Sequence, residues 1–165
     1  MKKTLLILTT LALIGLSNLV NAQVPNWVWA ESSGNTSNDQ GRSVATDTNG
    51  NVFITGYFNG SSITFGDITL TSAGNGDVFI VKYDANGNVL WAKSAGGTDY
   101  DLSNGISTDA SGNVLITGSF LSETMIFDTI TLTNADNTGI YSDIFIAKYD
   151  ASGNILWAKR AGETE

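Results

Sequence analysis

Aspartate is the residue whose spacing in this sequence most suggests chemistry. Asp47, Asp84, Asp109 and Asp150 each begin the pattern Asp-x-x-Gly-Asn. This pattern resembles the start of a calcium-binding loop, but the bidentate glutamate that closes such a loop is missing. An aspartate carboxylate can also accept hydrogen bonds from backbone N–H groups two residues on, and glycine supplies a positive φ. We interpret the four patterns as hairpin turns, with calcium binding as the alternative.

Tryptophan is the second residue type that suggests a binding role. Trp29, Trp91 and Trp157 are each followed by alanine and recur 62 and 66 residues apart. An exposed set of indoles could stack on sugars, but recurrence at one position of a repeat favours packing between repeats. Trp27 lies outside the pattern and is the tryptophan most available to a ligand.

Lysine and paired aspartates complete the candidates. Lys82 and Lys148 recur in the pattern F-I-x-K-Y-D, which favours a structural ion pair with a nearby aspartate over a ligand carboxylate. Two aspartate pairs suggest the carboxylates of a glycosidase, namely Asp99 with Asp101 and Asp47 with Asp84. Neither pair is unique to one place, and repeated residues usually build a scaffold. We predict no catalytic residues and no enzymatic activity.

The composition excludes several further classes of protein. The chain has 165 residues and contains neither cysteine nor histidine. Disulfides, thiolate chemistry and a lipidated cysteine are therefore excluded, and the commonest general base and metal ligand is missing. The net charge of −8 repels phosphate backbones, so we expect no nucleic-acid partner. We also expect no cofactor and no metal.

The N-terminus has the pattern of a cleaved signal peptide. Lys2 and Lys3 precede an apolar run over residues 4–16, and a more polar segment ends in Val20-Asn21-Ala22. This pattern predicts a signal peptide over residues 1–22 with cleavage before Gln23. A membrane anchor is the alternative, but a run of about a dozen apolar residues is short for a span of about 20. We expect a secreted or cell-surface protein without a membrane span, with the periplasm also possible.

The chain is built on one internal repeat. The segment Asp77–Lys93 recurs as Asp143–Lys159 with thirteen of seventeen positions identical, and Asp39–Phe58 recurs as Asp101–Phe120. The second copy is four residues longer, and the extra residues fall in 134–142. Self-similarity at a fixed period indicates a repeat architecture, with insertions placed in loops.

Each copy has the pattern of short β-strands and lacks a helical period. The Asp-x-x-Gly-Asn turns predict two hairpins in each copy, and residues 63–71 predict a smaller hairpin between them. Residues 77–84 carry apolar side chains on both faces, so we expect this strand to be covered on both sides. About four such strands in tandem repetition predict an all-β fold of antiparallel β-propeller blades. We expect Asp77–Lys93 to form the inner half of a blade.

A resemblance to a known family rests on several of these motifs together. The segments G-N-V-F-I-T-G-Y-F, I-T-F-G-D-I-T-L-T-S-A-G, D-V-F-I-V-K-Y-D-A-N-G-N-V-L-W-A-K and G-G-T-D resemble the seven-bladed beta-propeller repeat family of secreted bacterial proteins. The resemblance covers residues 29–165. It implies a propeller fold and export, and it implies no catalytic residues.

The repeat divides the chain into five parts. After the signal peptide, we expect a leading strand and linker over 23–38, repeat 1 over 39–94, repeat 2 over 95–159, and the start of a third repeat over 160–165. The leading strand, 26–31, matches the last strand of a repeat. Because two blades cannot close a ring, we expect either a fragment of a longer reading frame or a chain that associates with copies of itself.

The two copies differ most where a ligand would be recognised. Residues 134–141 form the longer loop of the second copy, and we predict Asp136 and Tyr141 there, together with Trp27, as ligand contacts. The predicted function is an exported, non-catalytic scaffold that binds an unknown protein or glycan. The alternatives are the propeller portion of a secreted, glycan-active enzyme and an adhesin-type structural repeat array.

Overall fold

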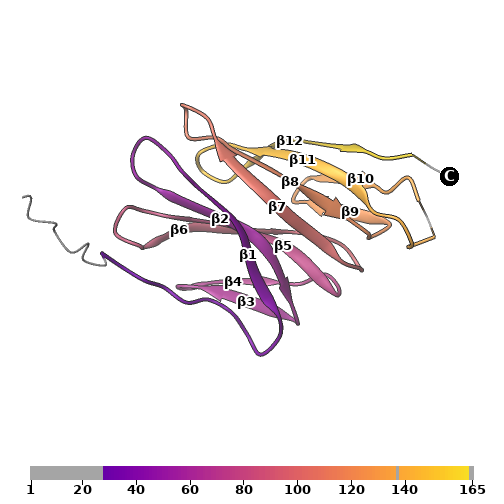
Figure 1. Ribbon diagram of the computed structural model, residues 1–165, viewed down its shortest axis with the longest axis horizontal. Coiled ribbons are helices and arrows are strands. Elements are labelled where there is room, and N and C mark those ends of the chain that lie inside the picture. Colours follow the sequence, from indigo (N-terminus) through magenta and orange to yellow (C-terminus); the bar gives the residue numbers. More distant parts are fainter. Residues whose placement is uncertain (1–27, 137, 164–165) are drawn as a thin grey trace, which may run out of the picture.

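The computed structural model describes residues 28–136 and 138–163, which form twelve β-strands (Figure 1). The predicted signal peptide and Trp27 lie outside the described residues. Among the described residues, no helix has the length and apolarity needed to cross a membrane.

The strands form two four-stranded antiparallel sheets, one in each repeat, and this confirms the predicted all-β blades. The first blade has the order β1-β2-β5-β6, with β1 (Asp39–Thr46), β2 (Val52–Asn59), β5 (Gly76–Tyr83) and β6 (Val89–Ala95). The second blade has the order β7-β8-β11-β12, with β7 (Asp101–Thr108), β8 (Val114–Phe120), β11 (Asp143–Tyr149) and β12 (Ile155–Ala161).

A small hairpin interrupts each blade between its second and third strands, as the sequence predicts. The hairpins are β3 (Ser62–Phe65) with β4 (Ile68–Thr71), and β9 (Thr124–Phe127) with β10 (Ile130–Thr133). Each hairpin packs its apolar side chains on one face of its own blade. Phe65, for example, lies 5.0 Å from Phe79, measured between ring centroids. We call this face of each blade its leading face and the opposite face its trailing face.

The main core lies between the two blades. Phe53, Val78 and Ile80 of the first blade's trailing face cluster with Ile116 and Phe145 of the second blade's leading face. The hairpin β9–β10 adds Met125 and Phe127 to the same cluster. All eight residues of β5 are buried, which confirms that this strand is covered on both sides.

The blades approach each other most closely at β1 and β7 (Figure 1). The Ile106 N–H donates to the Ser43 Oγ at 3.3 Å, and the Thr108 Oγ1 donates to the Thr46 carbonyl at 2.9 Å. Strands β5 and β6 form the other half of their sheet. The expectation that Asp77–Lys93 forms the inner half is therefore wrong, because the order of strands along a chain does not reveal which sheet edge meets the neighbouring blade.

The second blade leaves its trailing face open. Ile144 is 59% exposed, whereas Val78 at the same repeat position is 0% exposed. Ile146 is 40% exposed, whereas its equivalent Ile80 is 0% exposed. The same sequence pattern is thus buried in the first blade and solvated in the second, because only the first has a neighbour on this side.

The described part of the leader, residues 28–38, contains no strand, so the predicted leading strand is wrong for these residues. A strand needs a neighbouring strand for its ladder of hydrogen bonds. In a repeat, the equivalent of the leader pairs with the third strand of the blade, but in the first blade β6 already pairs with that strand, β5. The leader instead places Trp29 on the leading face of the first blade, stacked on Tyr83 with ring centroids 5.6 Å apart.

The connection between the blades is held by a buried aspartate. Asp101 is fully buried, and its carboxylate accepts hydrogen bonds from the Gly97 N–H, the Ser122 N–H and the Ser122 hydroxyl. Burial raises the pKa of Asp101 to about 6, and the nearby Asp77 carboxylate adds to the increase. Asp77 is also buried, and its pKa is raised for the same reason.

We expect Asp101 to make the chain less stable as the pH rises from 4.5 to 7. Its pKa is raised above the ordinary 3.8, so its contribution to stability is complete below pH 3.8 and is lost as the pH rises through about 6. Urea unfolding at several pH values should show the free energy of unfolding of the native chain, measured relative to Asp101→Asn, falling by about 2 kcal/mol over this range. A difference that stays constant would contradict the assignment.

Candidate functional site

The four Asp-x-x-Gly-Asn segments are hairpin turns, as predicted, and their carboxylates are occupied within the turns. The Asp84 carboxylate accepts hydrogen bonds from the Asn86 N–H at 2.8 Å, the Asn88 N–H at 2.9 Å and the Asn88 side-chain amide at 2.8 Å. These bonds, led by the one from the Asn88 side chain, lower the pKa of Asp84. The other three turns repeat the pattern. Among the described residues, no group of three or more acidic side chains is arranged to hold a metal ion.

Two of the repeated tryptophans dock on a turn of a blade. The Trp91 indole N–H donates to the Ala151 carbonyl at 3.2 Å, which joins the first blade to the second. The Trp29 indole N–H donates to the Ala85 carbonyl at the same distance, 3.2 Å. The prediction of packing between repeats is thereby confirmed for Trp91. Trp29 makes the same contact from the leader.

The two repeated lysines differ in their partners. Lys148 forms the predicted ion pair, with its Nζ 2.9 Å from the Asp109 carboxylate. Lys82 instead donates to the Ala151 carbonyl at 3.1 Å and lies over the ring of Phe53. Lys82 has this different partner because the second blade covers the face on which it lies, and the prediction of an ion pair is wrong for Lys82.

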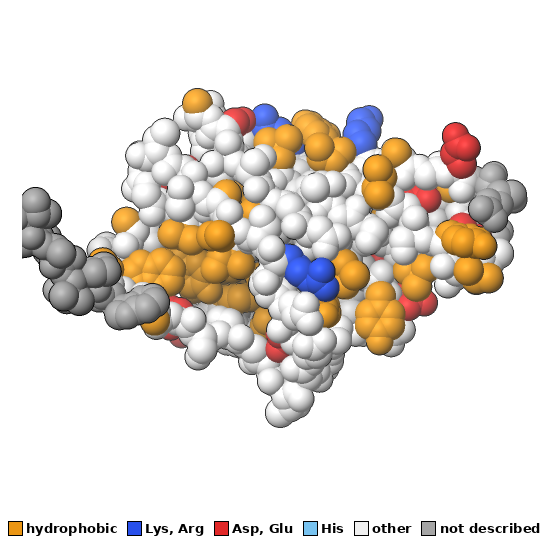
Figure 2. Space-filling view, viewed as in Figure 1, with side chains coloured by type: hydrophobic (Ala, Val, Ile, Leu, Met, Phe, Trp, Pro, Cys, Tyr) orange, Lys and Arg blue, Asp and Glu red, His pale blue; other side chains and the backbone are white. Residues whose placement is uncertain are grey.

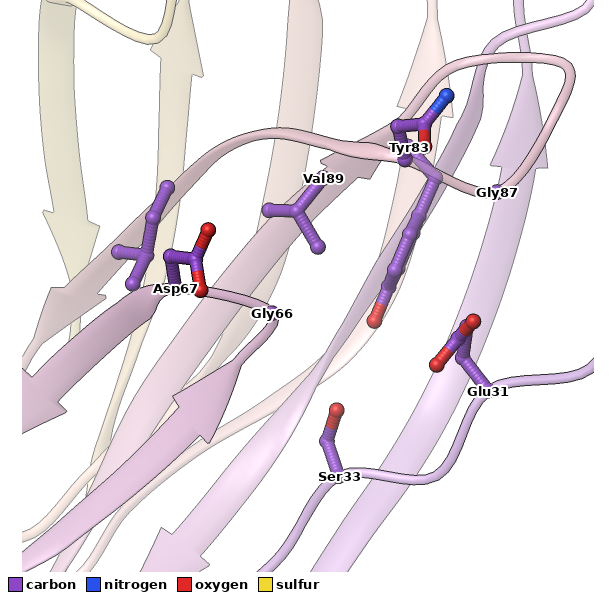
Figure 3. Close-up of a pocket in the computed structure, with 9 residues that line it drawn as sticks. Glu31, Ser33, Gly66, Asp67, Tyr83, Gly87 and Val89 are labelled. Carbon is purple, nitrogen blue, oxygen red and sulfur yellow. The ribbon is translucent and has the colours of Figure 1, made fainter.

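A pocket of about 310 Å³ on the leading face of the first blade is a candidate binding site. Figure 3 shows that the leader contributes Glu31 and Ser33, the turn between β3 and β4 contributes Asp67, and β5 contributes Tyr83. The polar ends of Glu31, Ser33 and Tyr83 are directed into one space, with Val89 on its apolar side. Burial raises the pKa of Tyr83, the Ser33 hydroxyl opposes this increase and the Glu31 carboxylate adds to it. Tyr83 therefore keeps its hydroxyl proton at neutral pH.

The pocket can exchange hydrogen bonds with a polar, uncharged ligand. Its carboxylates accept and its hydroxyls both donate and accept, which suits the adjacent hydroxyl groups of a sugar. Sequence reasoning missed this site because its residues come from three separate segments. One signal could have indicated it: Glu31 and Ser33 stand where the next repeat has Lys93 and Ala95.

The predicted ligand contacts Asp136 and Tyr141 lie together in the long loop of the second blade, apart from the residues that line the pocket. The Asp136 carboxylate accepts bonds from the Thr138 hydroxyl and from the Ile140 and Tyr141 N–H groups. These bonds, led by the one from Thr138, lower the pKa of Asp136 to about 2, and they show that this side chain organises the loop. Tyr141 is exposed. A ligand role for both residues stays a prediction, as it does for Trp27.

The comparisons with known proteins agree with this architecture. Residues 33–64 match the family described as "Beta-propeller repeat" (SBBP). The chain is 33% identical, over 127 residues and 70% of its length, to the uncharacterized WD repeat-containing protein L264 of Acanthamoeba polyphaga mimivirus. It is 32% identical, over 89 residues and 54% of its length, to the regulatory protein FlaEY of Caulobacter vibrioides.

These similarities bear on the repeat fold. The alignments span 9% of the length of each of the two relatives, so they concern the repeat and not the whole of either protein. Two packed four-stranded blades, together with a match to a propeller repeat, support a β-propeller repeat scaffold.

Proposed function

We propose that the chain is an exported, non-catalytic β-propeller-repeat scaffold that binds a glycan or protein at or outside the cell surface. The observation that carries this proposal is the contrast between repeated and non-repeated residues. The repeated aspartates accept hydrogen bonds within their turns, and the repeated tryptophan Trp91 binds the turn of the next blade. The pocket, in contrast, is lined by the non-repeated Glu31 and Ser33. The pattern of the first 22 residues supports export.

The ligand class that fits the pocket best is a neutral carbohydrate. Two carboxylates, two hydroxyls and the amide of Asn88 offer several polar partners within a small volume, beside the apolar Val89 and Ile68. The carboxylates of Glu31 and Asp67 disfavour anionic ligands, and the net charge of −8 has the same effect at longer range.

The test begins with the complete chain expressed in a bacterial host. We expect the chain to be recovered outside the cytoplasm with Gln23 as its first residue, as judged by mass spectrometry. On a glycan array, neutral glycans should bind, and calorimetry should show affinity falling at least about tenfold in Glu31→Gln or Asp67→Asn, the cost of removing one charged hydrogen-bond partner. The exposed residue Glu123 lies outside the pocket, so Glu123→Gln is the matched control. A chain retained in the cytoplasm, or binding unaffected by either pocket variant, would contradict the proposal.

A further inference from the structure

Each end of the blade pair presents an open apolar surface. On the trailing face of the second blade, Ile144 and Ile146 are exposed, and a hollow of about 280 Å³ lies among Leu115, Thr117 and Ile146. On the leading face of the first blade, Val44 is 64% exposed and a hollow of about 220 Å³ lies beside Val44 and Ile54. Figure 2 shows apolar surface over the first blade.

Each of these two surfaces is the repeat equivalent of one side of the interface between the two blades. Between the blades, Ile106 on the leading face of the second blade packs against the cluster that includes Phe53 and Ile80 on the trailing face of the first blade. The repeat maps each of these residues onto an open surface: Ile106 onto Val44, Phe53 onto Leu115, and Ile80 onto Ile146. Val44 pairs with Ile54 across the sheet just as Ile106 pairs with Ile116, so both lie on the leading face.

We propose that the trailing face of the second blade binds the leading face of the first blade in a second copy of this chain. The contact is head-to-tail, since it joins two different surfaces. Backbone hydrogen bonding supports an alignment of the two copies equivalent to that of the two blades. Inside the chain the Thr108 Oγ1 donates to the Thr46 carbonyl, and between copies the Thr46 Oγ1 meets the Thr108 carbonyl by the same repeat relation. The proposed ligand pocket lies on the same leading face, so the two occupants would use overlapping surface. The contact between copies follows from the repeat relation alone and does not rest on a ligand.

Trp29 regulates this contact because it occupies the place that the partner's tryptophan requires. In the interface between the blades, Trp91 of the first blade donates to the Ala151 carbonyl in a turn of the second blade. The equivalent residue on the open trailing face is Trp157, and the equivalent carbonyl on the open leading face is that of Ala85. The chain's own Trp29 already holds the Ala85 carbonyl and stacks on Tyr83. Head-to-tail association therefore requires Trp29 to leave this site.

Sedimentation velocity over a range of protein concentrations tests both parts of the proposal. We expect Trp29→Ala to strengthen self-association about tenfold, the value of one aromatic contact and one hydrogen bond. Trp29→Phe keeps a smaller aromatic ring on Tyr83 and loses the N–H with part of the stacking area, so it should strengthen association less than Trp29→Ala does. We expect Ile146→Asp, alone or combined with Trp29→Ala, to weaken association at least about 30-fold, as for an interface hot spot.

The matched control is Leu156→Asp. Leu156 lies on the second blade and is 50% exposed, and its equivalent Leu90 on the first blade is also 50% exposed, so this position stays outside the blade interface. Leu156→Asp should leave association unchanged. A Trp29→Ala chain that stays folded by circular dichroism and remains monomeric would overturn the proposal, as would equal effects of Ile146→Asp and Leu156→Asp.

The head-to-tail direction can be tested by crosslinking because the chain has no cysteine of its own. Val44 lies on the open leading face and Gly105 on the open trailing face. They are the repeat equivalents of Ile106 and Ser43, which meet between the blades. Both single-cysteine variants, Val44→Cys and Gly105→Cys, should carry the Trp29→Ala change. When mixed and oxidised, they should yield a disulfide-linked dimer, whereas either variant alone should yield little. A dimer formed equally well by one variant alone would indicate a symmetric contact and would overturn the head-to-tail arrangement.

Discussion

Replacing Ile80 with alanine will lower the free energy of unfolding by about 3 kcal/mol, whereas the same change at Ile146 will lower it by about 1 kcal/mol or less. The two residues have the same side chain and the same repeat position. They differ in burial, since Ile80 is fully buried between the blades and Ile146 lies on the open trailing face. The alanine at position 80 leaves a cavity in the main core, and the alanine at position 146 leaves only additional solvated surface.

This comparison isolates the effect of the neighbouring blade. Both substitutions lose the same β-propensity and the same number of carbon atoms, so the difference between them reports packing against the second blade. Urea unfolding followed by circular dichroism would measure it, at concentrations where sedimentation shows only monomer. Equal losses at the two positions would mean that the blades do not pack on each other in solution.

Gly153→Ala will destabilise the chain by about 1 to 3 kcal/mol more than Gly112→Ala does. Both glycines occupy the fourth position of an Asp-x-x-Gly-Asn turn, with φ values of 83° and 76°. An alanine at either position therefore incurs a similar backbone cost of about 1 kcal/mol. A Cβ at position 153 would lie 2.9 Å from the nearest ring atom of Trp91, whereas a Cβ at position 112 would meet nothing closer than 3.6 Å.

The additional loss at Gly153 measures how closely Trp91 sits on the turn of the second blade. Chemical denaturation gives the stability of both variants, and tryptophan fluorescence gives a second readout, because displacement of Trp91 exposes its indole to water. We expect an emission shift to longer wavelength only in Gly153→Ala. Identical stabilities for the two variants would show that the indole does not rest on this glycine.

The local parts of the fold could be predicted from the sequence. The turns at Asp47, Asp84, Asp109 and Asp150 follow from short-range hydrogen bonding, and the strands follow from the alternation of side chains around them. The packing role of Trp91 followed from its recurrence. Its acceptor did not, because a backbone carbonyl such as that of Ala151 leaves no signal in the sequence.

The non-local parts could not be predicted from the same patterns. The leader matches the last strand of a repeat in sequence, but residues 28–38 form no strand. The strand with which it would pair in the first blade, β5, is already paired with β6. The assignment of Asp77–Lys93 to the inner half failed because the pattern of a hairpin is the same at either edge of a sheet. The pocket at Glu31 and Asp67 was missed because its residues converge only after the leader folds onto the first blade.

The docking of Trp91 and Lys82 on the Ala151 carbonyl has a consequence for how such genes change in length. Both side chains bind a main-chain atom, which is present whatever residue occupies position 151. Recombination between equivalent points of two repeats removes or adds one whole unit, and each blade that is followed by another still meets a turn that offers the same acceptor. Copy number can therefore drift by unequal exchange without any new contact having to arise by point mutation.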